Sequence, residues 1–347
     1  MPHERGGLPV QVTMDDVATE ARVSRATVSR VLAGNVKVND ATKGRVHRAI
    51  DRLGYVPNLA AQALATKRST LVGLLLRDPR KPVYGLLHSE IQDRAAAAGL
   101  ELITVVPTSS QGAADEQRSL HKLLGLRVAG LLVATGVSNG GHLAPLLGTV
   151  PVVSVGRPER HPGIHGISHD ERANGRLIAD AVADRGHREV AVLAPIKALS
   201  SPEHQRAASM IRQLRARDVT VRSVRANTLG VRDEGNAELL ELVSQRSVTC
   251  VMFPSDERAL EFMAACQRAG IAIPEDVSVT GVDGVSAGLG LIGLTTVRLP
   301  VADVAARAVS LMADLVAGRS RPVRHQKHAG ELVDGTTLGT AGAGRRT

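Results

Sequence analysis

The sequence predicts a small all-α head followed by a larger α/β core that contains two doubly wound parallel sheets. Two short amphipathic helical segments with an abrupt break between them lie within residues 12–32. From residue 71 onward, short apolar runs alternate with amphipathic helical stretches. This alternation is typical of parallel strands whose two faces are both covered by helices. With 347 residues, the chain is long enough for two or three domains.

The first helix of the head is predicted to begin after Thr13. Thr13 and Asp16, three positions apart, can form a capping box. Val17, Ala18 and Ala21 then fall on one apolar stripe of a helix. Because this periodicity stops at residues 22–24, we expect a turn there.

The second helix is predicted to begin after Ser24, which is a favourable N-cap residue. Val28, Val31 and Leu32 form its inward face. The opposite face carries small, polar and basic side chains, namely Arg25, Ala26, Ser29 and Arg30. Such a helix suits the major groove of DNA. On these residues alone, a helical hairpin with solvated arginines remains an alternative.

A third helix is predicted from about Asp40 to Leu53, with Asn39 as its cap and Gly54 at its end. Its buried stripe consists of Val46, Ile50 and Leu53. Residues 1–11 carry no helical or strand pattern, and we expect them to be disordered.

Seven apolar runs predict the strands of the core. They are residues 71–76, 100–106, 130–134, 151–155, 189–194, 248–253 and 276–282. Helical stretches separate most of them, at residues 84–98, 115–126, 174–185, 201–217 and 257–269. The pattern restarts near residue 165, which favours two doubly wound halves over a single sheet.

The positive charge is concentrated in the head. Residues 1–68 hold 11 Lys and Arg against 6 Asp and Glu, more than half of the net charge of +9. This distribution is expected of a nucleic-acid-binding module attached to a nearly neutral body. No apolar run approaches 18 residues, and the N-terminus carries no apolar leader, so we predict neither a membrane span nor a secretion signal. Cys250 and Cys266 are too few and too far apart for a zinc site.

Three stretches of the head occur in a recognisable order and spacing. They read V-T-M-D-D-V-A, V-S-R-A-T-V-S-R-V-L and L-G-Y-V-P-N-L-A-A-Q-A-L, the last at residues 53–64. Together they resemble the DNA-binding head of the lactose-repressor (LacI/GalR) family of bacterial transcription regulators. Stretches of the core, such as I-P-E-D-V-S-V-T-G-V-D at residues 273–283, resemble the same family. The resemblance extends from residue 12 to about residue 335.

The resemblance implies a periplasmic-binding-protein-like core of two subdomains with an effector in the cleft between them. The chain would cross between the subdomains near Gly163, Leu294 and Arg324. The implied organisation is a tail (1–11), a helix-turn-helix head (12–58), a hinge helix with a linker (59–69) and a core (70–340). Subdomain one would hold about residues 70–163 with 295–324, and subdomain two about 164–294 with 325–340.

The resemblance also assigns roles in DNA binding. Arg25, Ala26 and Arg30 stand where the family contacts bases, and an Arg can fork onto guanine O6 and N7. Side chains expected at the phosphates are Ser24, Thr27, Ser29, Lys37 and Asn58. Leu64 would wedge into a central base step from the minor groove. At Arg22 the family commonly has Gly, so a positive φ there would cost roughly 1 kcal/mol.

Six positions match the effector pocket of the family, namely Asp78, Tyr84, Arg157, Arg206, Asp256 and Asp283. Other pocket positions depart from the family pattern, with Val83, Gly156, Ser255 and Gly284 as the replacements. If Arg77, Lys81, Arg157 and Arg206 crowd one mouth, an anionic ligand such as a sugar phosphate or sugar acid is expected. The alternative is that these cations are simply solvated at strand ends.

Two further patterns do not predict sites. The G-x-G-x-x-G match at residues 288–293 is followed by an extended segment instead of a helix, so no dinucleotide cofactor is expected. His161, His165 and His169 lie around Pro162 and Gly163, and we interpret them as exposed loop residues, not metal ligands. No nucleophile–base–acid arrangement stands out, so the protein is not predicted to be an enzyme.

The predicted function is a ligand-responsive transcriptional regulator of the bacterial cytoplasm and nucleoid. It would bind a pseudo-palindromic DNA operator as a homodimer, most often as a repressor, while a sugar, sugar phosphate or sugar acid alters its DNA affinity. No cofactor, metal or membrane partner is expected. The alternatives are a solute-binding module, an effector-independent regulator with a degenerate pocket, and a cytosolic sugar-processing enzyme.

Overall fold

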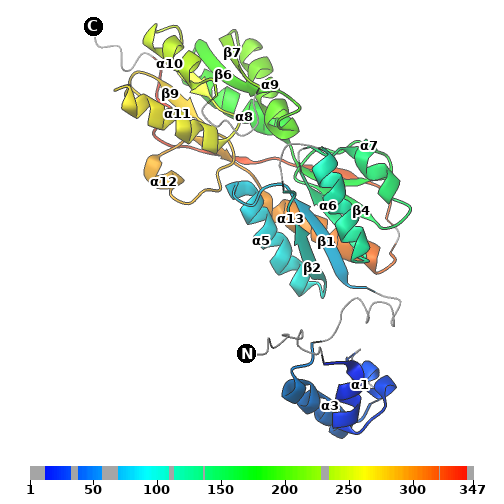
Figure 1. Ribbon diagram of the computed structural model, residues 1–347. Helices are drawn as coiled ribbons and strands as arrows, with labels where there is room; N and C mark the ends of the chain where they lie inside the picture. The colour runs from blue at the N-terminus through cyan, green and yellow to red at the C-terminus, as the bar shows by residue number, and fades with distance from the viewer. Residues whose placement is uncertain are drawn as a thin grey trace, which may run out of the picture. The chain divides into compact units, whose positions relative to one another are not determined.

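The computed structural model describes residues 12–32, 38–56, 69–108, 113–135, 137–227, 234–319 and 321–341. The chain divides into two compact units, Met1–Thr70 and Leu71–Thr347, which we call the head and the core (Figure 1). The predicted tail and the predicted hinge helix up to Leu64 lie outside the described residues.

The head contains three helices, α1 (Met14–Ala21), α2 (Arg25–Leu32) and α3 (Asp40–Leu53). Thr13 and Asp16 form the predicted capping box, with Thr13 N donating to Asp16 Oδ2 at 2.8 Å and Asp16 N to Thr13 Oγ1 at 3.3 Å. The side chains that pack the helices together are Val17, Ala18, Ala21, Val28, Val31, Val46, Ala49 and Tyr55. The predicted helices of the head are therefore confirmed.

Capping side chains also fix the ends of α3. Asn39 Oδ1 accepts from Thr42 N at 2.8 Å, and Gly54 ends the helix with a φ of 63°. Arg22 ends α1 in the same left-handed region, with a φ of 55°. The turn between α1 and α2 therefore requires a backbone conformation that glycine adopts more readily than arginine.

The first sheet of the core has six parallel strands in the order β11-β5-β4-β3-β1-β2. These strands are β1 (Leu71–Leu76), β2 (Glu101–Val105), β3 (Gly130–Ala134), β4 (Val152–Val155), β5 (His165–His169) and β11 (His325–His328). Side chains alternate along β1, so Leu74 packs against helix α5 (Pro82–Ala97), and Leu75 against helix α6 (Ala113–Gly125). Helix α13 (Val301–Val316) shares the α5 face.

The second sheet has four parallel strands in the order β7-β6-β8-β9. They are β6 (Glu189–Pro195), β7 (Thr220–Ala226), β8 (Cys250–Met252) and β9 (Ser278–Thr280). One face packs against helices α8 (Glu171–Asp184) and α9 (Ser201–Arg215). The other packs against helices α10 (Asn236–Ser244) and α11 (Asp256–Arg268). Two parallel sheets covered by helices confirm the predicted fold class.

Three connections join the two halves of the core, which Figure 1 shows side by side. The chain passes from β5 into α8, from β9 through β10 (Thr296–Arg298) into α13, and from β11 into β12 (Glu331–Val333). Strands β10 and β12 pair antiparallel between the halves. We call the half with the six-stranded sheet subdomain one and the other half subdomain two.

Two of the expected crossing points are wrong. Strands β5 and β11 both belong to the first sheet, so the first crossing follows His169 instead of Gly163, and the third follows His328 instead of Arg324. The prediction that the histidines lie in an exposed loop is also wrong for His165 and His169, which are buried in β5. The sequence of β5, H-G-I-S-H, contains a single apolar side chain. It therefore lacks the apolar run that marked the other strands, although β5 is buried.

Candidate DNA-contacting face and effector cleft

Helix α2 presents the predicted DNA-contacting residues on its solvent face. Arg25, Ala26 and Arg30 are exposed, and Ser29 is half-buried. Arg25 Nη1 lies 3.6 Å from Asp15 Oδ2, and both side chains are about two-thirds exposed (69% and 67%). An exposed ion pair at this distance contributes little to stability. The Arg25 guanidinium can therefore exchange Asp15 for another acceptor at small cost.

The start of α2 is held by hydroxyl groups. Ser24 Oγ accepts from Thr27 N at 3.2 Å and lies 2.9 Å from Thr27 Oγ1. These contacts satisfy one of the free N–H groups at the helix N-terminus, where a phosphate would also bind. The other expected DNA contacts, Lys37, Asn58 and Leu64, lie outside the described residues.

A cavity of about 70 Å³ lies at the carboxyl ends of the strands, between the two subdomains of the core. Helix α5 follows β1 and brings Lys81 and Tyr84 to it, while β5 ends beside it at His169. From subdomain two, the starts of α9 and α11 bring Arg206 and Asp256. This is the position at which open α/β sheets bind ligands. We call this cavity the effector pocket.

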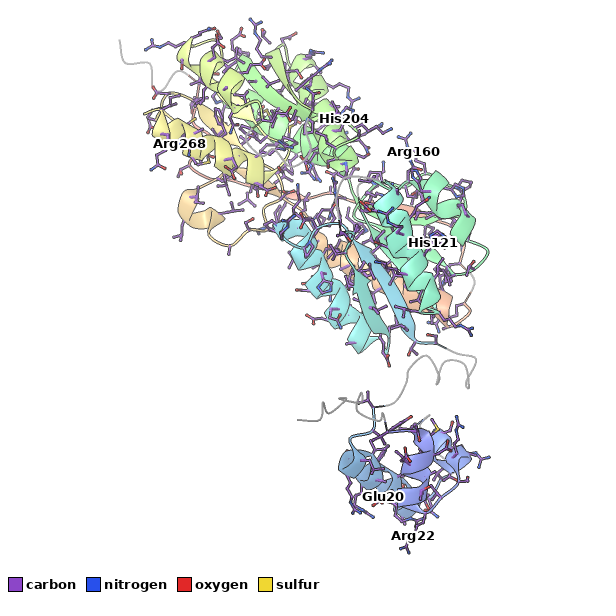
Figure 2. All side chains as sticks on the ribbon, viewed as in Figure 1. Glu20, Arg22, His121, Arg160, His204 and Arg268 are labelled. Carbon is purple, nitrogen blue, oxygen red and sulfur yellow. The ribbon has the colours of Figure 1, made fainter. Side chains whose placement is uncertain are left out.

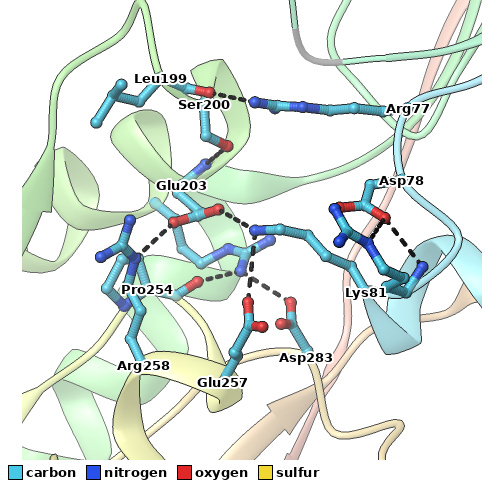
Figure 3. Close-up of polar contacts among 12 residues, drawn as sticks. Arg77, Asp78, Lys81, Leu199, Ser200, Glu203, Pro254, Glu257, Arg258 and Asp283 are labelled. Atoms are coloured by element: carbon cyan, nitrogen blue, oxygen red, sulfur yellow. Dashed lines mark hydrogen bonds and ion pairs between the residues drawn. The ribbon is translucent and has the colours of Figure 1, made fainter. Parts of the chain in front are cut away.

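Arg206 is the centre of the polar contacts in the effector pocket. Its Nε donates to Glu171 Oε2 at 2.7 Å. Its Nη1 donates to Asp283 Oδ1 at 3.1 Å and to the Pro254 carbonyl oxygen (Figure 3). The guanidinium is almost fully buried. Burial alone lowers the pKa of Arg206, but Glu171 and Asp283 raise it above its usual value. Arg206 is therefore a fixed cation.

Asp256 and Asp283 differ in what they can offer a ligand. Asp256 Oδ1 accepts from Thr296 Oγ1 at 2.6 Å, and Asp256 Oδ2 accepts from Gly284 N at 2.7 Å. Both carboxylate oxygens of Asp256 are thus engaged in holding β10 and the loop after β9. Burial raises the pKa of Asp283 well above its usual value, against the opposing effect of Arg206. Asp283 is the more adaptable acceptor of the two.

Charged contacts bridge the two subdomains across the pocket. Lys81 Nζ lies 3.8 Å from Glu203 Oε1 and 3.6 Å from Glu257 Oε2 (Figure 3). Arg77 Nη2 donates to the Leu199 carbonyl oxygen at 2.7 Å. Burial alone lowers the pKa of Lys81, but the two glutamates raise it above its usual value. Lys81 therefore links the two subdomains across the effector pocket.

Two family models match the chain. The one described as bacterial regulatory proteins, lacI family, matches residues 13–58, and a periplasmic binding protein-like domain matches residues 179–338. Catabolite control protein A of Priestia megaterium is 30% identical over 311 residues, which cover 87% of this chain and 92% of that protein. The chain belongs to the lacI family of bacterial regulatory proteins.

Other members of the family show the same extent of similarity. The regulator GalR of Escherichia coli is 29% identical over 317 residues, covering 89% of this chain and 91% of that protein. The lac repressor dimer bound to operator and the anti-inducer ONPF superposes with a TM-score of 0.82 at 25% identity, covering 95% and 99% of the two chains. This lacI-family member is therefore a DNA-binding transcriptional regulator with a ligand-binding core. None of the helices in the described ranges is long and apolar enough to span a membrane.

The structure of this family member brings four of the six expected effector residues together. Tyr84, Arg206, Asp256 and Asp283 line the effector pocket. Asp78 does not, because it receives hydrogen bonds from Arg80 at 2.9 and 3.0 Å. Arg157 lines a separate cleft, where its Nη2 donates to Glu159 Oε2 at 2.7 Å.

Several pocket residues were not found from the sequence, namely His169, Glu171, Glu203 and Glu257. His169 is the last residue of β5, and the three glutamates lie in the first turn of the helix that follows a strand; these positions were the available signal. With Asp256 and Asp283 they place five carboxylates in the pocket lining, against the two cations Lys81 and Arg206. Of the four cations expected at one mouth, Lys81 and Arg206 line the effector pocket and Arg157 lines the separate cleft. Arg77 lines neither, and donates to the Leu199 carbonyl oxygen. Carboxyl groups therefore outnumber cations in the lining of the effector pocket. This lining favours a neutral or cationic ligand in that pocket over an anionic one.

Some buried polar atoms of the effector pocket have no hydrogen-bond partner among the described residues. They are both ring nitrogens of His169, Glu171 Oε1 and Ser255 Oγ. A buried polar atom without a partner costs free energy unless a ligand or water satisfies it. The pocket therefore offers both donors and acceptors to a small polar molecule.

Proposed function

We propose that this regulator is a repressor that binds a pseudo-palindromic operator as a homodimer. Its affinity for the operator would change when a neutral sugar occupies the effector pocket. The proposal of a neutral sugar rests on the residues that line the effector pocket. Its unpartnered His169, Glu171 and Ser255 atoms adjoin an Arg206 whose charge is already balanced by carboxylates. Hydroxyl groups can donate to such carboxylates and accept from such donors.

The relatives support a sugar as the effector class. They include the ribose operon repressor of Lactococcus lactis, which is 29% identical over 274 residues, and the regulator CelR, whose structure is a complex with cellobiose. A phosphorylated sugar in the same pocket would meet five carboxyl groups against two cations, and the excess of acidic groups disfavours a further negative charge at low local dielectric. A neutral sugar avoids this repulsion.

Binding is proposed to require opening of the cleft. The effector pocket holds about 70 Å³, whereas pockets for small ligands measure about 300–1,000 Å³. Three chain connections join the subdomains, so a hinge movement can separate them without unfolding either sheet. The sugar would then bind the arrangement of subdomains that fits it and shift the population toward that arrangement.

In this proposal, two heads read two half-sites. Arg25 and Arg30 would contact guanine edges, with Ala26 close to a thymine methyl group. Phosphate contacts would come from Ser24, Thr27, Ser29, Lys37 and Asn58. Leu64 from each subunit would wedge into the central base step. The site of action would be the cytoplasm, in association with the nucleoid.

Selection of bound DNA from a random pool tests the DNA half of the proposal. We expect a pseudo-palindromic site, in which two half-sites occur together only when the protein is dimeric. The effector half is tested by gel shift on that site with a panel of neutral sugars and their phosphates. Recovery of no enriched sequence would overturn the DNA half, and a response to a phosphate but to no neutral sugar would overturn the effector half.

A matched pair of variants ties the response to the pocket. Asp283→Asn should abolish the sugar response, because Asp283 is the adaptable acceptor that contacts Arg206. Asp276→Asn alters an aspartate outside the pocket lining and should leave the response intact. Equal sugar responses of the two variants would place the effector elsewhere.

A further inference from the structure

A second cleft lies between the two subdomains and shares no lining residue with the effector pocket. Its volume is about 770 Å³, within the range of small-molecule sites. Subdomain one contributes Arg157 and Arg160 from the connection between β4 and β5. Subdomain two contributes Arg172 from the start of α8 and Lys197 from the connection between β6 and α9. We call it the basic cleft.

The two walls of the basic cleft face each other across the subdomain boundary. Figure 2 labels Arg160 on subdomain one and His204 on subdomain two, at the neighbouring ends of the two halves. Both residues line the same cleft. A ligand in this cleft would therefore touch both subdomains at once.

Charge in the basic cleft is strongly unbalanced. Four guanidinium or ammonium groups line it, against one carboxylate, that of Glu159. Glu159 is already engaged, because it accepts from Arg157 Nη2 at 2.7 Å and from the backbone N–H groups of Arg160 and His161 at 2.7 and 3.0 Å. Among the residues that the structure describes, Arg160, Arg172 and Lys197 have no carboxylate within ion-pair distance.

A buried donor adds to this imbalance. Arg157 is almost fully buried, and its Nε has no hydrogen-bond partner among the described residues. Polar partners of other kinds also line the cleft, including Asn139 and Ser201, the first residue of the 15-residue helix α9. The N-terminus of such a helix favours negative charge. The cleft thus combines an unpartnered buried donor, exposed cations and a helix N-terminus.

We propose that the basic cleft binds a small phosphorylated molecule as a second ligand, whose phosphoryl oxygens are held by Arg160 from subdomain one and by Arg172 and Lys197 from subdomain two. Bidentate hydrogen bonds from arginine suit phosphate oxygens. Because the cations come from both walls, the bound anion replaces repulsion across the cleft with attraction and stabilises one arrangement of the subdomains. The two clefts differ in charge, and so the acidic effector pocket and the basic cleft select different ligands.

The two ligands are then thermodynamically coupled. Both clefts lie at the same boundary between the subdomains, so each ligand biases the same hinge. A change that one ligand makes in the affinity of the other must be reciprocal. The regulator would integrate two metabolic signals through a single movement.

Calorimetric titration of the full-length protein with pyrophosphate tests the site. We expect saturable binding to the wild type that weakens as salt rises. The double variant Arg160→Gln/Lys197→Gln and the single variant Arg172→Gln should each lose affinity by about tenfold or more, since charge-assisted hydrogen bonds are removed. All three side chains are exposed, so folding should be preserved.

The control is the double variant Arg215→Gln/Arg268→Gln, which removes two exposed arginines outside both clefts. It should bind pyrophosphate within about twofold of the wild type, because it keeps the cleft cations. The basic head is unchanged in every variant, so any binding of anions there cancels in the comparison. Equal affinity of the cleft and control variants, or no saturable binding by the wild type, would overturn the proposal.

The sugar response separates this proposal from the proposed function. Asp283→Asn should retain pyrophosphate binding while it loses the sugar response. The cleft variants should retain direct binding of the sugar. If Asp283→Asn lost pyrophosphate binding while the cleft variants bound pyrophosphate as tightly as the wild type, the phosphate would lie in the effector pocket. That result would contradict the second site.

Discussion

Arg22 occupies a left-handed backbone position at the end of helix α1, where its φ is 55°. A side chain with a Cβ atom is strained in this region, whereas glycine is not. The strained residue lies in the turn that sets the angle between α1 and α2. The arginine therefore lowers the stability of the DNA-reading head without touching its core.

Arg22→Gly should stabilise the head by about 1 kcal/mol, because it removes the strain at positive φ. Hydrogen exchange of head peptides in the full-length protein, followed by mass spectrometry, measures this change. Arg48→Gly is the control with the opposite sign. Arg48 is exposed within helix α3, where a change to glycine should lower the stability of the head by about 1 kcal/mol. Faster exchange in Arg22→Gly than in the wild type would contradict the argument.

His169 makes stability depend on pH. Burial lowers its pKa from 6.5 to about 4. The unfolded chain therefore takes up a proton that the folded chain does not, at any pH between these values. The stability associated with neutral His169 is fully present above about pH 6.5 and is lost as the pH falls toward 4.

We expect the wild type to lose about 2 kcal/mol more stability than His169→Asn when the pH falls from 7 to 5. Urea unfolding at the two pH values gives the comparison. His121→Asn, which changes an exposed histidine, should behave like the wild type. A pH dependence that is the same in all three proteins would show that His169 does not titrate in this way.

At the scale of single residues, the sequence predicted local geometry well and pocket chemistry less well. The capping box of Thr13 and Asp16 depends on neighbours in the chain, and so the pattern alone identified it. Glu171 and Glu203 enter the pocket through contacts with Arg206 and Lys81, which lie far away in sequence. No local pattern records such contacts, and the sign of the pocket charge was therefore misjudged.

Helix α2 is the element on which DNA recognition is expected to depend. Its buried face is fixed by Val28 and Val31, while Arg25 and Arg30 remain exposed. Substitutions on the exposed face should therefore change DNA binding with little effect on folding.

Arg25→Ala and Arg30→Ala should each weaken binding to the selected operator by about 1–3 kcal/mol and leave binding to scrambled DNA largely unchanged. Fluorescence anisotropy with both DNAs at fixed salt gives the two affinities. Arg48→Ala, on the exposed side of α3, is the control and should leave the difference between the DNAs intact. Equal losses on both DNAs would identify Arg25 and Arg30 as phosphate contacts.

At the scale of elements, apolar runs identified seven of the ten strands in the two parallel sheets. All seven predicted runs contain a strand, from β1 to β9. Strands β5, β7 and β11 were missed because their sequences are polar, as in H-Q-K-H at β11. β7 and β11 lie at sheet edges, where one side is not covered by another strand and polar side chains are tolerated.

The whole molecule depends on how readily the core opens. Lys81 joins subdomain one to Glu203 and Glu257 of subdomain two. Its side chain is 36% exposed, so each ion pair contributes modestly after screening by solvent. We therefore expect Lys81, together with Arg77, to influence how readily the subdomains separate.

Lys81→Met should shift the core toward the open arrangement and change sugar affinity by about fivefold or less at low salt. Small-angle scattering should show a larger radius of gyration, and the difference from the wild type should shrink as salt rises. Lys122→Met, on the exposed side of α6, should match the wild type in both measurements. A variant as compact as the wild type at low salt would show that these ion pairs do not control closure.

The shared construction of the two sheets has a consequence for synthesis on the ribosome. Subdomain one begins at β1 but receives helix α13 and its edge strand β11 only after the four-stranded sheet of subdomain two has been made. Until then, strand β5 presents an unpaired edge, and the apolar surface that α13 covers in the finished protein is bare. The nascent chain must therefore keep its first half incomplete while the second half folds, and this interval is when a chaperone would be most needed.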